Sequence, residues 1–115
     1  MAPMTDRRAN ASHRTQMESL ARLSAQVEEL FLRASTLQDF IPPELADEIA
    51  ATAGEIMVEL AKDRGDDLAR WVIEDARRLR EVVRTIHPES ARAAEAGRAL
   101  VCDLQLVIRE DKRAA

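Results

Sequence analysis

Few side chains in this sequence could carry out acid-base, nucleophilic or metal chemistry. The chain has 2 His and 1 Cys, at His13, His87 and Cys102. A histidine that accepts a phosphoryl group needs an ordered position in mid-helix, whereas His13 adjoins a polar N-terminal segment and His87 precedes Pro88. Two distant histidines and one cysteine give no ligand pair at i, i+3 or i, i+4 spacing. We therefore expect no metal site and no cofactor.

Composition and charge narrow the classes of partner. A single cysteine cannot form an intramolecular disulfide, which favours a cytoplasmic location. No segment approaches the ~20 consecutive apolar residues of a membrane span. A net charge of -4 and a pI of about 5.2 disfavour nucleic-acid binding, which needs clustered surplus Lys and Arg. A protein partner remains the expectation, with no nucleic acid and no membrane.

The overall composition predicts an all-α protein. Only 3 Gly and 4 Pro occur, and aromatic residues make up 3% of the chain, so turn formers and strand-favouring residues are scarce. The first residues show no periodic apolar positions, which predicts a flexible N-terminal arm over residues 1–12. Residues 13–112 then form a single helical-bundle domain.

Four segments carry apolar residues at spacings of three and four, the period of an amphipathic helix. Pro42 and Pro43 end the first segment, and Pro88 separates the third from the fourth. The apolar stripes before and after Gly65 are offset by about a third of a turn, which favours a break there over one long helix. The first three predicted helices cover about residues 20–41, 43–64 and 67–86. The fourth begins at residue 88 and frays over residues 109–115. Loops this short make consecutive helices antiparallel neighbours, so we predict an antiparallel up-down four-helix bundle.

Some apolar side chains lie off these stripes. Val58, Ile73, Cys102 and Leu106 each lie more than about 90° from the stripe of their own helix. Such residues could form a second contact surface for a homodimer or a protein partner. Trp71 flanks the third stripe, and we expect it to pack at the edge of the core.

Charged residues form an acidic row on the second predicted helix and a basic row on the third. One interpretation is that these rows make ion pairs between neighbouring helices or simply solvate the surface. The other is a charged docking face, in which Glu48, Glu55 and Glu59 contact a basic partner.

The segment CDLQLVIRE, from Cys102 to Glu110, resembles the QDLTGQVI helix of the CheZ-type chemotaxis phosphatases. In that family an Asp and a Gln four residues later share one helix face, and the Gln orients the water that attacks an aspartyl phosphate. Here Val107 occupies the second position. Gln105 follows Asp103 by only two residues, so the two side chains point roughly 160–200° apart. The resemblance therefore implies a related scaffold without the catalytic pair.

Small helical chains of this size also resemble the CheT proteins of rhizobial chemotaxis operons. That resemblance implies binding to a receptor methyltransferase or a response regulator, so we expect a non-catalytic adaptor in bacterial signalling. Two alternatives stay open. In an auxiliary phosphatase, Asp103 would position the partner's lysine or metal and Gln105 would orient water. In a histidine phosphotransfer bundle, His87 would accept the phosphoryl group.

Overall fold

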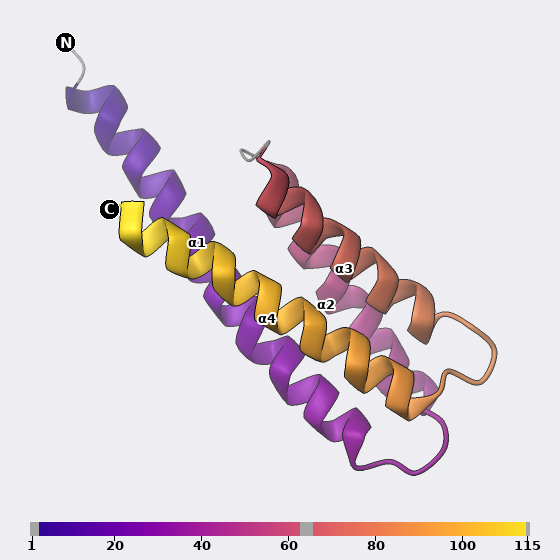
Figure 1. The fold of residues 1–115 in the computed structure, drawn as a ribbon. Helices are drawn as coiled ribbons and strands as arrows, with labels where there is room; N and C mark the ends of the chain where they lie inside the picture. The colour runs from indigo at the N-terminus through magenta and orange to yellow at the C-terminus, as the bar shows by residue number, and fades with distance from the viewer. Residues whose placement is uncertain (1–2, 63–65, 115) are drawn as a thin grey trace.

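The chain folds as an all-α, antiparallel up-down four-helix bundle (Figure 1). The computed structural model describes the backbone of residues 3–62 and 66–114, and the side chains from residue 13 onward within those ranges except 112 and 114. Its overall dimensions are 58 × 21 × 21 Å. The helices of this part of the chain are α1 (Pro3–Ser35), α2 (Pro43–Ala61), α3 (Asp67–Val83) and α4 (Ser90–Ala114).

Each helix packs against two others. Helix α1 contacts α2 and α4, and α3 contacts the same two helices from the opposite corner. Within residues 3–62 and 66–114, α1 and α3 make no contact across the diagonal, and neither do α2 and α4. The helices therefore sit at the corners of a square, and one face of each is left for the common core.

The predicted apolar stripes supply this core. On α1, for example, Leu20, Leu23 and Val27 recur at helical spacing and are each at most 2% exposed. The other three helices contribute in the same way, and the largest of their fully buried side chains are Ile56, Leu60, Val72, Leu79, Leu100, Leu104 and Val107. Burial of a Leu, Ile or Val side chain contributes about 1.5–3 kcal/mol, which makes the stripes the main source of stability.

The N-terminal part of α1 differs from the prediction. The sequence predicts a flexible arm over residues 1–12, whereas α1 begins at Pro3. Pro is favourable in the first turn of a helix, and the residues up to Ser12 include several good helix formers and no Gly. Figure 1 shows this segment continuing the axis of α1 past the ends of the other helices. The helix therefore extends beyond the packed domain.

The other end of α1 comes earlier than predicted. The helix ends at Ser35 instead of near Ile41. The Ser35 hydroxyl donates to the Leu32 carbonyl oxygen at 2.7 Å, and the Thr36 hydroxyl donates to the Arg33 carbonyl oxygen at 2.7 Å. These hydroxyl groups satisfy carbonyls of the last turn and terminate the helix. Ile41 is still buried, but it reaches the core from the loop.

Helices α2 and α3 are separate, as predicted. Helix α2 starts at Pro43 and ends at Ala61, and α3 starts at Asp67. Asp66 is the N-cap of α3, because its Oδ1 accepts a hydrogen bond from the Ala69 amide at 2.7 Å. Gly65, the predicted stop, lies outside the described residues.

Helix α3 ends at Val83, three residues before the predicted end. The Thr85 hydroxyl donates to the Val82 carbonyl oxygen at 2.9 Å, and His87 has a positive φ of 60°. A left-handed residue turns the chain away from the helix axis. Ile86 therefore leaves the stripe and is 89% exposed, so its assignment to the core is wrong. Helix α4 then begins at Ser90 and not at Pro88.

Helices α1 and α4 approach most closely at Gly97. A Cβ atom built on this buried glycine would lie 2.6 Å from the Phe31 Cβ atom. Gly54 on α2 is different, because a Cβ atom there would meet nothing within 4 Å. The two glycines thus share a helical backbone and differ only in the space around them.

This contrast predicts opposite effects of the same substitution. We expect Gly54→Ala to raise the free energy of unfolding by about 0.5–1 kcal/mol, because Ala is the better helix former. We expect Gly97→Ala to lower it by about 1–3 kcal/mol, because α1 and α4 must move apart. Urea denaturation followed by circular dichroism measures both. A stabilised Gly97→Ala protein would contradict the close approach.

Candidate functional site

The α1–α2 and α3–α4 loops lie at the same end of the bundle (Figure 1). Main-chain hydrogen bonds join them. Phe40 and Glu89 form an isolated antiparallel bridge. The Ile41 amide donates to the Pro88 carbonyl oxygen at 2.9 Å, and the Ser90 amide donates to the Asp39 carbonyl oxygen at 3.0 Å. These bonds fix the α1–α2 loop against the α3–α4 loop and close this end of the bundle.

An open groove of about 710 Å³ lies beside the joined loops, between α2 and α3. Its α2 wall consists mainly of small side chains, because Ala46, Ala50 and Gly54 recur at i, i+4 spacing on one face. The α3 wall carries Arg80, Val83 and Arg84. The groove falls in the size range of ligand-binding clefts, so it is the candidate functional site.

The two arginines of the groove, Arg80 and Arg84, have no ion-pair partner among the residues that the structure describes. Other arginines of α3 are paired on their own helix, Arg70 with Asp67 at 3.3 Å and Arg77 with Glu74 at 2.6 Å. The two guanidinium groups of the groove are thus available to an anionic ligand.

Aromatic and apolar side chains border the same groove at the loops. The Phe40 ring is 54% exposed, and its centroid lies 5.4 Å from that of the His87 ring. Asp47 on α2 is the one carboxylate that lines the groove. The lining therefore combines two cations, one anion and an exposed ring. This set has the chemistry of a binding surface.

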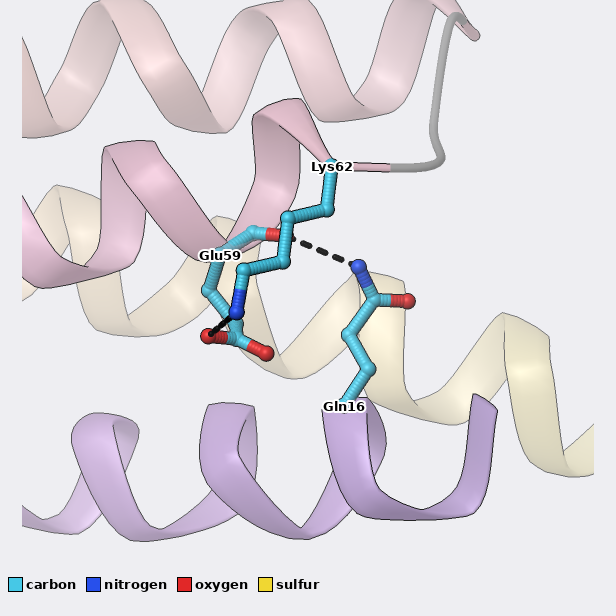
Figure 2. Close-up of polar contacts among 3 residues, drawn as sticks. All are labelled: Gln16, Glu59 and Lys62. Carbon is cyan, nitrogen blue, oxygen red and sulfur yellow. Dashed lines mark hydrogen bonds and ion pairs between the residues drawn. The ribbon is translucent and has the colours of Figure 1, made fainter. Parts of the chain in front are cut away.

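The acidic residues predicted to contact a partner are partly engaged within the chain. Glu48 accepts from Arg33 of α1 at 3.2 Å, and both side chains are exposed. The Glu59 carboxylate pairs with Lys62 at 3.1 Å and is only 16% exposed (Figure 2). Glu55 is exposed. No described acidic residue of α2 pairs with a described arginine of α3, so the predicted rows do not join these two helices.

Glu59 is also held through its main chain. Gln16 of α1 is buried, and its Nε2 donates to the Glu59 carbonyl oxygen at 2.8 Å (Figure 2). This carbonyl lies in the last turn of α2, where the helix itself supplies few donors. Gln16 therefore ties α1 to the C-terminal end of α2, and Glu59 is a structural residue more than a free docking residue.

The predicted apolar contact residues do not form one surface. Val58 on α2 is 62% exposed, and Cys102 and Leu106 on α4 are also exposed. Helices α2 and α4 occupy opposite corners of the bundle, so Val58 is separated from the other two. Ile73 is half-buried and packs against the core, which corrects its assignment to a contact surface. Trp71, expected at the core edge, is 68% exposed.

Asp103 and Gln105, the weak catalytic candidates, lie apart. The Asp103 carboxyl faces Asp75 of α3 within hydrogen-bonding reach, whereas Gln105 is exposed on another side of α4. Burial, a hydrogen bond with Asp103 and repulsion from that carboxylate raise the pKa of Asp75 to about 7, although Arg78 opposes the shift. The structure thus brings Asp103 to a second carboxyl and not to an amide.

Of the two histidines, only His87 lies outside a helix, whereas His13 lies within α1. His87 is in the α3–α4 loop, and His13 on α1 pairs with Asp111 near the end of α4. Among the described residues, no group of three His, Cys, Asp or Glu side chains could hold a metal ion. No helix in the described ranges is long and apolar enough to cross a membrane.

Sequence reasoning placed Arg80 and Arg84 in the basic row of the third predicted helix, but it missed the groove that they line and the contact of Asp75 with Asp103. The i, i+4 spacing of Arg80 and Arg84 and the small residues of α2 are visible in the sequence. Whether these arginines and small residues face each other, however, depends on which helices are neighbours and on how each helix is rotated about its own axis. A row of alanines is by itself a sign only of close packing.

Comparison of the chain with protein-family models, with curated proteins and with solved structures finds no match in any of the three. The resemblance of the segment from Cys102 to Glu110 to the CheZ-type phosphatases, and that of the chain's size and helical type to the CheT proteins, therefore stay predictions. The functional argument rests on the geometry of the groove.

The contact between Gln16 and Glu59 gives a test of the packing of α1 on α2. We expect Gln16→Ala to lower the free energy of unfolding by about 1–2 kcal/mol. The Glu59 carbonyl oxygen would lose its 2.8 Å hydrogen bond from Gln16 and keep, among the described residues, only the 3.5 Å one from the Lys62 amide. Gln26→Ala is the matched control, since Gln26 is exposed on the same helix, and it should change stability by less than about 0.5 kcal/mol. Equal effects in chemical denaturation would rule out a stabilising role for the hydrogen bond.

Proposed function

We propose that this chain is a non-catalytic, protein-binding regulator whose groove between α2 and α3 receives an acidic, partly apolar segment of a partner protein. One observation carries the proposal. Two guanidinium groups, those of Arg80 and Arg84, line a groove of about 710 Å³ without an ion pair among the described residues. A partner carboxylate would supply the missing counter-charge.

The chemistry of the lining supports a peptide with mixed character. Arg binds carboxylates through paired, charge-assisted hydrogen bonds, which are stronger than neutral ones. The Phe40 ring and the small α2 side chains offer apolar area beside these cations. Asp47 would repel a segment that is acidic throughout, and it would favour one with a basic or neutral residue at that position.

The dipole of α3 helps to hold the two arginines of the groove in place. Arg80 and Arg84 lie at the C-terminal end of α3, where the negative pole of the helix stabilises cations. The arginines therefore remain in place without a partner. Arg84 is exposed next to the α3–α4 loop, so a partner can reach its guanidinium group.

The pathway is a further part of the proposal. The single cysteine supports a cytoplasmic location. The resemblances to the CheZ-type and CheT proteins support a place in bacterial chemotaxis, and the receptor methyltransferase and the response regulator are the first partners to test. A non-catalytic role is supported by the separation of Asp103 from Gln105, which share no helix face. A second copy of this chain is a further partner to test for binding at the groove between α2 and α3.

Selection from a random-peptide display library on the immobilised full chain tests the groove. We expect the selected peptides to be enriched in Asp or Glu next to apolar residues. Arg80→Gln combined with Arg84→Gln should weaken their binding about tenfold or more, measured by fluorescence anisotropy. The control is Arg70→Gln with Arg77→Gln, which removes two paired arginines from the same helix and should change the Kd by less than about twofold. Peptides without acidic residues, or equal effects of the two variants, would refute the groove.

Purified chemotaxis proteins test the pathway and the absence of catalysis. We expect titration calorimetry to detect binding of the receptor methyltransferase or of the response regulator. We expect the lifetime of the regulator's aspartyl phosphate to stay unchanged when this chain is added. A shortened lifetime that Gln105→Ala restores would establish the auxiliary phosphatase instead. A phosphorylated chain that His87→Gln abolishes would establish phosphotransfer.

A further inference from the structure

Two carboxyl groups meet across the contact between α3 and α4. Asp75 of α3 and Asp103 of α4 are both half-buried, and their side chains lie within hydrogen-bonding reach. Asp75 Oδ2 is buried and has no hydrogen-bond partner among the described residues. Two ionised carboxylates offer only acceptors, so they repel each other and leave this oxygen unsatisfied. A proton on one of them supplies the missing donor.

The surrounding charges do not remove the need for this proton. Arg78, on α3 itself, favours the ionised form of Asp75, and Asp103 from α4 opposes it. Helix α2, which also packs on α3, contributes no charged group that acts on Asp75 among its described residues. Burial and the neighbouring carboxylate outweigh Arg78, and they raise the pKa of Asp75 from 3.8 to about 7.

We propose that Asp75 and Asp103 form a proton-dependent latch between α3 and α4. With its proton, Asp75 donates a hydrogen bond to Asp103 and holds the two helices together. Without it, the two carboxylates repel each other, and the α3–α4 contact weakens. This inference does not depend on the proposed binding groove, which lies on the opposite flank of α3 toward α2.

The direction of the pH effect follows from proton binding. Folded Asp75 keeps its proton up to about pH 7, whereas the unfolded residue releases it near its ordinary pKa of 3.8. Between these values the folded state binds the extra proton, so the contribution of the latch to stability falls as the pH rises. The contribution is complete below the lower value, and it is lost once the pH passes the upper one.

A natural reporter lies next to the latch. Trp71 precedes Asp75 at i, i+4 spacing and Leu106 follows Asp103 at i, i+3, so each shares a helix face with its carboxyl group. Because α3 and α4 are antiparallel, both apolar side chains lie about one turn from the latch on the same side. Trp71 is the single tryptophan of a chain without tyrosine, and it is 68% exposed. Its fluorescence therefore comes from one position on α3, about one turn from Asp75.

The experiment compares the wild-type chain with Asp75→Asn and with Asp103→Asn. Asparagine keeps the shape and supplies an amide donor at every pH. We expect the wild-type Trp71 fluorescence to change with a midpoint near pH 7. We expect Asp75→Asn to lose this transition. We expect Asp103→Asn to move its midpoint to a lower pH, because burial still raises the pKa of Asp75 but the neighbouring carboxylate is gone. At about pH 8 each variant should unfold at a temperature about 4 °C or more above the wild type, and at about pH 5 this gain should shrink to less than half.

Histidine titration is the competing explanation, because His ordinarily titrates near pH 6.5. A chain with His13→Gln and His87→Gln serves as the control, and it should keep the fluorescence transition. The two asparagine variants are independent, so either one tests the latch if the other does not fold. The latch is refuted if the wild type shows no transition, if the transition survives unchanged in Asp75→Asn, or if it disappears with the histidines.

Discussion

Each helix of this bundle has one apolar stripe, and no helix could bury that stripe alone. The four stripes meet along one axis, so the outer faces are mostly polar. Polar groups become partly buried on the flanks where neighbouring helices meet. Both features of functional interest lie on flanks of α3. Arg80 and Arg84 line the groove toward α2, and Asp75 faces Asp103 on the side of α4.

The size of the facing side chains decides whether two neighbouring helices pack closely or leave a groove between them. At the α1–α4 contact, Gly97 lets the two backbones approach until the Phe31 side chain fills the space. Along α2 the small residues are not met in this way, since the space around Gly54 stays open, and a groove results. Small residues therefore bring two helices together at one flank, and at the other they leave room for a ligand.

Much of the fold could be predicted from the sequence, because stripe periodicity and proline positions are local signals. The ends of α1 and α3 could not, since they depend on the hydroxyl groups of Ser35 and Thr36 and on the left-handed His87. The candidate site was harder to predict from the sequence than the fold. A groove and a contact between Asp75 and Asp103 arise from the register between helices, which no single helix encodes. The chemotaxis resemblance drew attention to Asp103 together with Gln105, but the partner of Asp103 comes from another helix.

The bridge between the two loops is made by main-chain atoms. Its hydrogen bonds therefore place few demands on the side chains around it, apart from the proline positions that shape the turns. Phe40 and Ile86, both largely exposed, can vary without loss of the scaffold. Sequence drift at this end of the molecule would alter which partner is recognised while the bundle persists. The same separation makes the loops a suitable place to engineer new specificity.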